Sequence, residues 1–424
     1  MSRSLFLGLL VYLLLLWGLA SARGELLALT APLVLFLLIG FWRAPHEMKL
    51  DIQRTLSAER VVPGAPVTVT LTVTNRGATL DEVLLEDVLP PPLSVTEGSN
   101  RHLVHLPAGK SVEWTYTVSG PRGYYPLDEI RAEGGDLFSL LRREETIKAN
   151  GQLFILPPTM RLRHIPIRPR RTRVYAGSIP ARAGGAGVDF FGVREYRTGD
   201  SPRAINWHVS ARHPQELFAN EYEQERVSDV GIVLDGRERT NHFGGGRSLF
   251  EHSVAAAAAL ADAFLNQGNR VGLLLYSNYL QWTLPGYGKL QRERILHALS
   301  QAHAGPSQIF ADLDHIPTKL FSAQSQIVVV SPLMAEDLEV LIQLRARGYQ
   351  VMVVSPDPVS FELQNLHSRG EVALAARVVR LERDLLLRKL QRAGIRTLDW
   401  NVLQPFDQAM RRVTGRWHPG GARW

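Results

Sequence analysis

Two apolar segments near the amino terminus constrain this chain more than any other feature of its sequence. Residues 5–20 and 26–42 contain no charged side chain, and a polar turn of five residues separates them. Each segment is close to the shortest length at which an apolar helix spans a bilayer, about 17 residues. Two such helices joined by a short turn predict a transmembrane helical hairpin over residues 1–44.

A cleavable signal peptide is the alternative interpretation of the first segment. Arg3 precedes the apolar run, and the small residues Ala20, Ser21 and Ala22 follow it in the pattern of a cleavage site. We prefer the uncleaved hairpin. Arg43 follows the hairpin and its turn is almost neutral, so the positive-inside rule places both of its ends in the cytoplasm. The expected location is the inner membrane, with the lipid bilayer as one partner and the soluble domains in the cytoplasm.

The length of 424 residues indicates more than one folded domain, and an apolar fraction of 45% is typical of globular chains. The chain has no cysteine, which excludes disulfide bonds and thiolate metal sites. Six arginines and no acid lie between positions 161 and 173. Such a run could bind nucleic acid or anionic lipid, but no nucleic-acid module accompanies it. We interpret residues 159–226 as a basic linker with a signature motif, and we expect no nucleic-acid partner.

Residues 45–158 carry the pattern of short β-strands. Apolar residues and threonine alternate with a period of two over residues 67–74, and a turn follows from Asn75 to Gly77. Further short strands are expected at residues 83–89, 103–106, 112–118 and 151–156. Strands at this spacing predict an all-β, immunoglobulin-like sandwich.

From residue 227 to residue 424, apolar strands alternate with helical patterns. Strands are expected at residues 230–235, 270–276, 326–331, 350–355 and 396–400. Helices are expected at residues 253–264, 290–299, 335–347 and 377–392. Buried strands joined by helices of this length predict a doubly wound, mostly parallel α/β sheet.

A dense set of charged and aromatic residues lies between these two regions. Gly199 and Asp200 indicate a turn, and Asp200 or Ser201 is placed to cap a short helix that begins near Pro202. The set resembles the signature of the Domain of Unknown Function 58 family, approximately R-x-Y-x-x-G-D-x-x-R-x-I-x-W-x-x-S-A-R. The matching residues are Arg194, Tyr196, Gly199, Asp200, Arg203, Ile205, Trp207, Ser210, Ala211 and Arg212.

The resemblance implies both an architecture and partners. Members of that family are expected to have a membrane hairpin, a β-sandwich, the signature and a von Willebrand factor A-like domain, in this order. They are expected to work beside a MoxR-type AAA+ ATPase in the assembly or maturation of protein complexes. The signature has no agreed catalytic role. We interpret it as a charged clasp in which Arg203 is buried, so that replacing Arg203 lowers stability.

A von Willebrand factor A-like domain also implies a divalent-cation site. Such a site takes oxygen ligands from a D-x-S-x-S segment after the first strand and from a later aspartate. Here Asp235 is followed by Arg237 and Arg239 at both serine positions, and Ser331 stands where the later aspartate is expected. Two cations beside one carboxylate disfavour Mg²⁺. We therefore expect a degenerate site with no metal and no other cofactor, and we interpret Asp235 as a cap or the partner of an arginine.

The sequence contains no G-x-S-x-G, no H-E-x-x-H and no complete phosphate loop. Together with the partners that the resemblance implies, this predicts a non-enzymatic, membrane-anchored adaptor for the ATPase and an unknown client protein. The polar, glycine-rich loop at residues 235–246 is the expected contact. Two alternatives remain. One is a hydrolase at the membrane surface with an unrecognised site around Asp200 and Arg203. The other is a structural envelope protein without an ATPase partner.

Overall fold

The computed structural model describes residues 3–21, 24–42, 48–135, 142–162, 165, 173–213, 215–244, 247–306, 313, 316–317, 320–322, 325–364, 366 and 370–414. The chain divides into two compact units, Met1–Leu156 and Pro157–Trp424. Each unit is described on its own.

Two helices begin the chain, α1 (Arg3–Ala20) and α2 (Gly24–Trp42). They contain 18 and 19 residues, near the lower limit for a membrane-crossing helix, and Pro32 lies inside α2. Among the described residues, no helix combines the length and the apolar character that crossing a bilayer requires. The predicted transmembrane hairpin over residues 1–44 is therefore wrong. The absence of charged residues predicts a membrane span, but the two helices are of marginal length for one.

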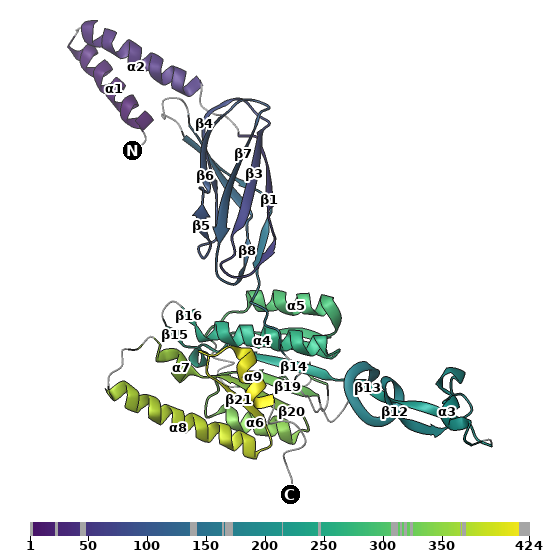
Figure 1. The fold of residues 1–424 in the computed structure, drawn as a ribbon. Helices are drawn as coiled ribbons and strands as arrows, with labels where there is room; N and C mark the ends of the chain where they lie inside the picture. The colour runs from purple at the N-terminus through teal and green to yellow at the C-terminus, as the bar shows by residue number, and fades with distance from the viewer. Residues whose placement is uncertain are drawn as a thin grey trace. The chain divides into compact units, whose positions relative to one another are not determined.

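The rest of the first unit is dominated by two four-stranded antiparallel sheets, with orders β1-β3-β7-β5 and β10-β9-β4-β6 (Figure 1). In β3, Val67, Val69, Leu71 and Val73 are fully buried and the intervening threonines are less so, which confirms the strand predicted at 67–74. The strands of these sheets are β1 (Leu50–Leu56), β3 (Val67–Asn75), β4 (Leu80–Asp87), β5 (Ser94–Glu97), β6 (Arg101–Leu106), β7 (Ser111–Ser119), β9 (Glu129–Gly135) and β10 (Arg142–Lys148). A smaller sheet contains β2 (Arg60–Val61), β8 (Gly123–Pro126) and β11 (Gln152–Ile155).

A buried ion pair joins the two larger sheets. Arg54 of β1 pairs with Asp87 of β4, and both side chains are fully buried. Tyr116 of β7 donates its hydroxyl to Asp87, and burial together with this carboxylate raises the pKa of Tyr116 above its ordinary value. Arg54 also donates to the backbone carbonyls of Leu127 and Ala149. The cluster therefore satisfies the hydrogen-bonding groups that it buries between the sheets.

The second unit is built on a mixed six-stranded sheet with the order β18-β17-β14-β19-β20-β21. Five of its strands are parallel: β14 (Asp229–Asp235), β17 (Arg270–Tyr276), β19 (Gln326–Val330), β20 (Gln350–Pro356) and β21 (Arg396–Trp400). These lie where the sequence predicts strands. The edge strand β18 (Leu280–Gly286) is antiparallel to β17 and was not predicted. The sheet is therefore mixed.

Helices cover both faces of this sheet. Figure 1 shows α4 (Leu249–Asn266) and α5 (Gly288–Gln301) on one face, and α6 (Asp337–Ala346) and α8 (Gly370–Arg392) on the other. On the second face, Val329 and Val353 of the sheet share a buried core with Leu341 and Leu390 of the helices. The shorter elements are η2 (Glu238–Thr240), β15 (Phe243–Gly244), β16 (Arg247–Ser248), α7 (Pro358–Glu362) and α9 (Phe406–Thr414).

The segment interpreted as a linker, residues 159–226, contains a two-stranded ribbon. β12 (Arg173–Glu195) and β13 (Phe218–Val227) form an antiparallel sheet of their own. The short helices η1 (Pro202–Ala204) and α3 (Trp207–Ser210) lie between them and carry much of the signature motif. Within the arginine run, Arg163, Arg168, Arg170 and Arg171 lie outside the described residues.

Candidate functional site

The carboxyl ends of β14 and β19 define the place at which a sheet of this order binds ligands. β14 lies between β17 and β19, so the chain first builds one side of the sheet and then the other. Such a reversal of strand order opens a crevice at the carboxyl ends of the two central strands. Asp235 is the last residue of β14, and Ser331 directly follows β19. The chemistry of the crevice therefore depends on what lies between these two residues.

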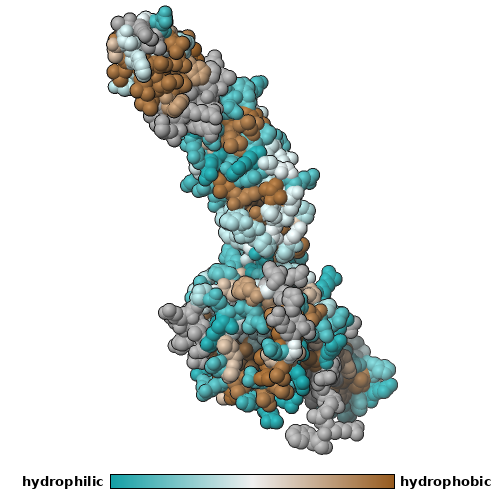
Figure 2. Space-filling view, turned by 90° about the vertical axis from the view of Figure 1, so that its left-hand side faces the viewer, coloured by the Kyte–Doolittle hydropathy of each residue, from teal (hydrophilic) through white to brown (hydrophobic). Residues whose placement is uncertain are grey.

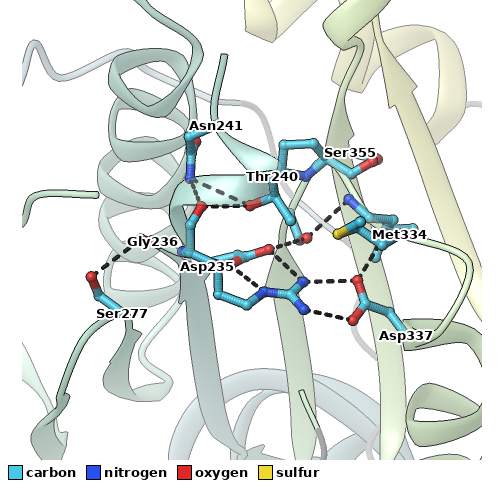
Figure 3. A network of polar contacts seen from close by, with 12 residues as sticks. Asp235, Gly236, Thr240, Asn241, Ser277, Met334, Asp337 and Ser355 are labelled. Atoms are coloured by element: carbon cyan, nitrogen blue, oxygen red, sulfur yellow. Dashed lines mark hydrogen bonds and ion pairs between the residues drawn. The ribbon is translucent and has the colours of Figure 1, made fainter. Parts of the chain in front are cut away.

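The guanidinium group of Arg237 fills this place (Figure 3). Its Nε donates to Oδ1 of Asp235 at 2.9 Å, and its Nη2 donates to Oδ2 at 2.8 Å. On its other side, Nη1 and Nη2 donate to Oδ1 and Oδ2 of Asp337 at 2.9 and 2.8 Å. Two carboxylates, one at the end of β14 and one at the start of α6, thus hold a single guanidinium through paired hydrogen bonds.

The two carboxylates of this cluster also accept hydrogen bonds from groups other than Arg237. Ser331 donates its hydroxyl to Oδ2 of Asp235 at 2.6 Å and accepts the backbone N–H of Leu333 at 3.0 Å. The backbone N–H of Met334 donates to Oδ2 of Asp337 at 2.8 Å. Leu333 has a φ of 65°, a left-handed conformation that costs energy for any residue other than glycine. This strained turn brings two backbone donors to the cluster.

Burial of the cluster disfavours its charged groups, whereas the hydrogen bonds and charges within the cluster favour them. Arg237 is 2% exposed, Asp337 is 1% exposed, and Asp235 is fully buried. Burial disfavours the charged form of Arg237, but the hydrogen bonds to Asp235 and Asp337 raise its pKa above the ordinary value. Burial also raises the pKa of Asp337, with a further contribution from the charge of Asp235, and Arg237 offsets only part of this rise. The pKa of Asp337 therefore rises mainly because of burial, whereas the pKa of Arg237 rises because two carboxylates accept its hydrogen bonds.

Hydrogen bonds to the backbone around Arg237 fix the loop that carries it. Thr240 donates its hydroxyl to the carbonyl of Arg237 at 3.0 Å, and Asn241 donates its amide to the same oxygen at 2.7 Å. Ser277, which follows β17, donates its hydroxyl to the carbonyl of Gly236 at 3.2 Å. The loop is therefore anchored to the neighbouring strand as well as to the ion cluster.

The sequence predicts only part of this cluster. The interpretation of Asp235 as the partner of an arginine is confirmed, and Arg237 is that arginine. Arg239 lies in η2 with an exposed side chain and is no member of the cluster. Asp337 was missed. The signal that points to it is the need of a buried arginine for carboxylates, together with the acids Glu336 and Asp337 shortly after β19.

The chemical capacity of the cluster is limited. The guanidinium lies between the two carboxylates and bonds to both oxygens of each. Across the part of the chain that the structure describes, no group of three or more histidine, aspartate or glutamate side chains is arranged to hold a metal ion. An ion cluster of this kind orders a loop, and it offers neither a nucleophile nor an unpaired base.

The first half of the signature motif is held by Arg194 and Asp200. Nη1 and Nη2 of Arg194 donate to the two carboxylate oxygens of Asp200 at 2.7 and 2.8 Å. The N–H of Arg197 donates to Oδ2 of Asp200 at 2.8 Å, and the hydroxyl of Tyr196 donates to its carbonyl at 2.7 Å. Arg194 first, and then the N–H of Arg197, lower the pKa of Asp200 to about 2. Gly199 has a φ of 106°, which permits the turn.

The second half of the motif is held by neutral hydrogen bonds. The side chain of Asn206 caps α3 by accepting a backbone N–H at 3.1 Å, and it donates to Oδ1 of Asn220 in β13 at 2.7 Å. Ser210 is 7% exposed, and its hydroxyl accepts the N–H of Phe218 at 2.9 Å. Ile205 is half-buried and forms a β-bridge to β13. These contacts fold the motif back onto β13.

Four side chains of the signature face solvent instead. Trp207 is 67% exposed, and Arg203, Ala211 and Arg212 are exposed as well. Nη2 of Arg212 lies 3.1 Å from Nε2 of His208, which is also exposed. Within the described residues, Arg203 makes no ion pair. The predicted clasp therefore needs a correction: Arg194 and Asp200 form it, and Arg203 is not buried.

Replacing Arg203 with alanine should change the free energy of unfolding by no more than about 0.5 kcal/mol, because the side chain is exposed. Replacing Arg194 with alanine should instead loosen the turn, since it removes the bidentate partner of Asp200. Faster amide exchange at Arg197, whose N–H bonds to Asp200, would report that loosening. A large stability loss in Arg203→Ala, with Arg197 equally protected in both variants, would restore the original clasp interpretation.

These features define a class of protein: a β-sandwich unit followed by an α/β unit whose central crevice is closed by an arginine of the chain itself. Residues 192–377 match the family described as "Protein of unknown function DUF58". This match covers somewhat less than half of the chain, and it confirms the resemblance carried by the signature motif. The association with a MoxR-type ATPase and the von Willebrand factor A-like assignment stay predictions.

A relative from Bacillus subtilis (strain 168), named "Uncharacterized protein YeaD", is 25% identical over 195 residues, 45% of this chain. The chain spans about half the length of that relative, 46%. Among solved structures, the CARDB domain of the PF1109 protein from Pyrococcus furiosus has a TM-score of 0.19 and 13% identity, covering 26% of this chain and 90% of that one. A FixG-related protein from Vibrio parahaemolyticus has a TM-score of 0.19 and 13% identity, covering 25% and 95%. Such low TM-scores support no argument about function.

Proposed function

We propose that this chain is a non-catalytic adaptor that binds a MoxR-type AAA+ ATPase and presents a client protein to it for assembly or maturation. The observation that carries the proposal is the cluster of Asp235, Arg237 and Asp337, which fills the central crevice with the chain's own side chains. A filled crevice supports a contact surface rather than a substrate pocket. The ATPase and the client come from the family resemblance, and a cytoplasmic location stays a prediction.

The proposed contact for the ATPase is the loop after β14, residues 236–248, of which 245–246 lie outside the described part. The base of this loop is held by the ion cluster and by Asn241. Phe243 of β15 is 70% exposed, and Glu238 and Arg239 are exposed nearby in η2. An exposed aromatic side chain with charged neighbours on a pre-ordered loop favours binding to another protein.

The alternative of a hydrolase around Asp200 and Arg203 has less support. With a pKa lowered to about 2, Asp200 is ionised near neutral pH and is a weak base. Both of its carboxylate oxygens already accept hydrogen bonds from Arg194. These features favour a non-catalytic role for the signature, and the exposed Trp207 is a suitable contact for the client.

Co-purification of the full chain with its cognate ATPase tests this function. Replacing Phe243 with serine should weaken the complex by roughly tenfold or more, because an exposed aromatic anchor would be lost. Leu284→Ser is the matched control, since Leu284 is also 70% exposed but lies in the edge strand β18. Added salt should weaken the wild-type complex through the charges of the loop. Finding no complex at low salt, with either ATP or ADP, would refute the proposal.

A further inference from the structure

One face of α8 anchors this helix to the α/β unit. Its buried side chains are Arg383, Leu387 and Leu390. Arg383 donates to Oδ1 of Asp399 from Nε at 3.0 Å and from Nη2 at 2.7 Å, and to the carbonyl of Pro332 at 2.8 Å. This face is therefore fully used within the chain.

The opposite face of α8 carries an exposed apolar row, named here the α8 stripe. Leu374 is 62% exposed, Val378 50%, Leu381 64% and Leu385 59%. Their alternating spacing of four and three residues places them on one face of a helix. At about 100° per residue, that face lies about 180° from Arg383. Figure 2, seen from the side on which α8 lies in Figure 1, shows apolar residues gathered low on this unit.

We propose that the α8 stripe binds the same stripe of a second copy of this chain, as an antiparallel helix pair with two-fold symmetry. In one register, Leu374 packs against the partner's Leu385, and Val378 packs against the partner's Leu381. The two-fold axis repeats both layers, so all four side chains of the stripe gain apolar partners. An apolar repeat of about 3.5 residues is the pattern by which two helices pack side by side.

The charges at the ends of the stripe favour the antiparallel orientation. Glu371 lies three residues before Leu374, and Arg388 lies three residues after Leu385, so both continue the spacing. In the proposed register Glu371 faces the partner's Arg388 at both ends of the pair. A parallel pair would instead bring each of these residues against its own copy, with like charges opposed.

A second charge pair fits the same register. Arg377 and Asp384 lie on one side of the stripe, are exposed, and make no ion pair among the described residues. In the antiparallel pair, Arg377 faces the partner's Asp384, and the symmetry makes this contact twice. The apolar layers and both kinds of charge pair are thus satisfied by one arrangement, and this self-complementarity identifies a second copy as the occupant.

The size of the stripe sets the expected strength of the dimer. Between Leu374 and Leu385 the helix rises roughly 16 Å. The contact is therefore small beside standard interfaces, which bury about 1,600 Å². We expect a reversible dimer whose population in the full chain rises with protein concentration in sedimentation experiments.

Disulfide cross-linking tests the orientation and the register, because the chain has no cysteine of its own. Purified Leu374→Cys and Leu385→Cys variants of the full chain should form a linked dimer when mixed. Each variant alone should not, since its own copies would lie roughly 16 Å apart along the pair. Arg380→Cys, an exposed position off the stripe, is the control and should form no disulfide-linked dimer. Cross-linking of each variant with itself would show a parallel pair, and no linkage in the mixture would overturn the proposal.

Charge reversal tests the same register without cysteine. Arg377→Asp places an acid opposite the partner's Asp384 and should raise the dimer dissociation constant by about tenfold. Combining it with Asp384→Arg recreates the pairs with exchanged signs and should restore dimerisation. Arg380→Asp makes the same charge change off the stripe and should leave the dimer unchanged. Failure of the double variant to recover, when its melting temperature equals that of the wild type, would exclude the register.

Discussion

Replacing Arg237 with alanine is expected to destabilise the α/β unit by about 3–5 kcal/mol, because two buried carboxylates lose their shared cation. Asp235 and Asp337 are at most 1% exposed, so water cannot replace the guanidinium without opening the fold. Arg237→Lys keeps the charge but loses the planar fork that bonds both carboxylates, and its loss should be intermediate. The second unit's transition in denaturant is the measurement, with the exposed Arg239→Ala as control.

The pH dependence of that loss is a further check on its cause. Burial already raises the pKa of Asp337, and without Arg237 this burial and the charge of Asp235 should raise it still further above its unfolded value of about 3.9. A carboxyl group with a raised folded-state pKa binds its proton more tightly in the folded state. The stability that it costs near neutral pH is therefore regained as the pH falls through that raised value. The difference in the free energy of unfolding between the Arg237→Ala variant and the wild type should narrow below neutral pH. A difference that stays constant with pH would contradict this account.

Replacing Arg383 with alanine should cost about 2–4 kcal/mol and loosen α8, because one buried guanidinium serves several acceptors. It bonds to Asp399, to the hydroxyl and carbonyl of Ser355, and to the carbonyl of Pro332. Removing it takes one donor from each of these oxygens, which lie at or just after the carboxyl ends of the neighbouring strands β19, β20 and β21. Amide exchange at Leu387 and Leu390 should accelerate together with the loss of global stability.

The matched control for this prediction is Arg380→Ala, on the same helix but exposed. It should change the free energy of unfolding by no more than about 0.5 kcal/mol. Equal free energies of unfolding of the two variants would mean that the buried hydrogen bonds of Arg383 add no net stability over an alanine.

Local patterns in the sequence predicted the strands that a short run of neighbouring residues determines. β3 alternates strictly between buried aliphatic residues and threonine, so its strand and its inner face follow from five or six residues. The five parallel strands of the second unit are short apolar runs between helices, which is also a local signal. Asp235 was recognisable because it ends such a strand and two arginines follow it closely.

Features that depend on distant parts of the chain were not predicted. Asp337 lies 100 residues after Arg237, and no spacing rule connects them. β18 contains Gln281, Trp282 and Thr283 and lacks the apolar run of its neighbours, since an edge strand is paired on one side only. Arg203 was expected to be buried because it belongs to a dense motif of charged residues, whereas its side chain is exposed.

The cation in the central crevice is a side chain of the polypeptide and is therefore present as soon as the chain has been synthesised. An ion taken from solution fills a site in proportion to its concentration and leaves again at some rate, so that the population of molecules is mixed. Arg237 is covalently part of the chain, and every folded molecule carries one guanidinium between Asp235 and Asp337. The sheet edge therefore needs no loading step after folding and keeps one composition as ionic conditions vary. To empty the crevice, the loop that carries Arg237 has to leave it and break the bonds to both carboxylates.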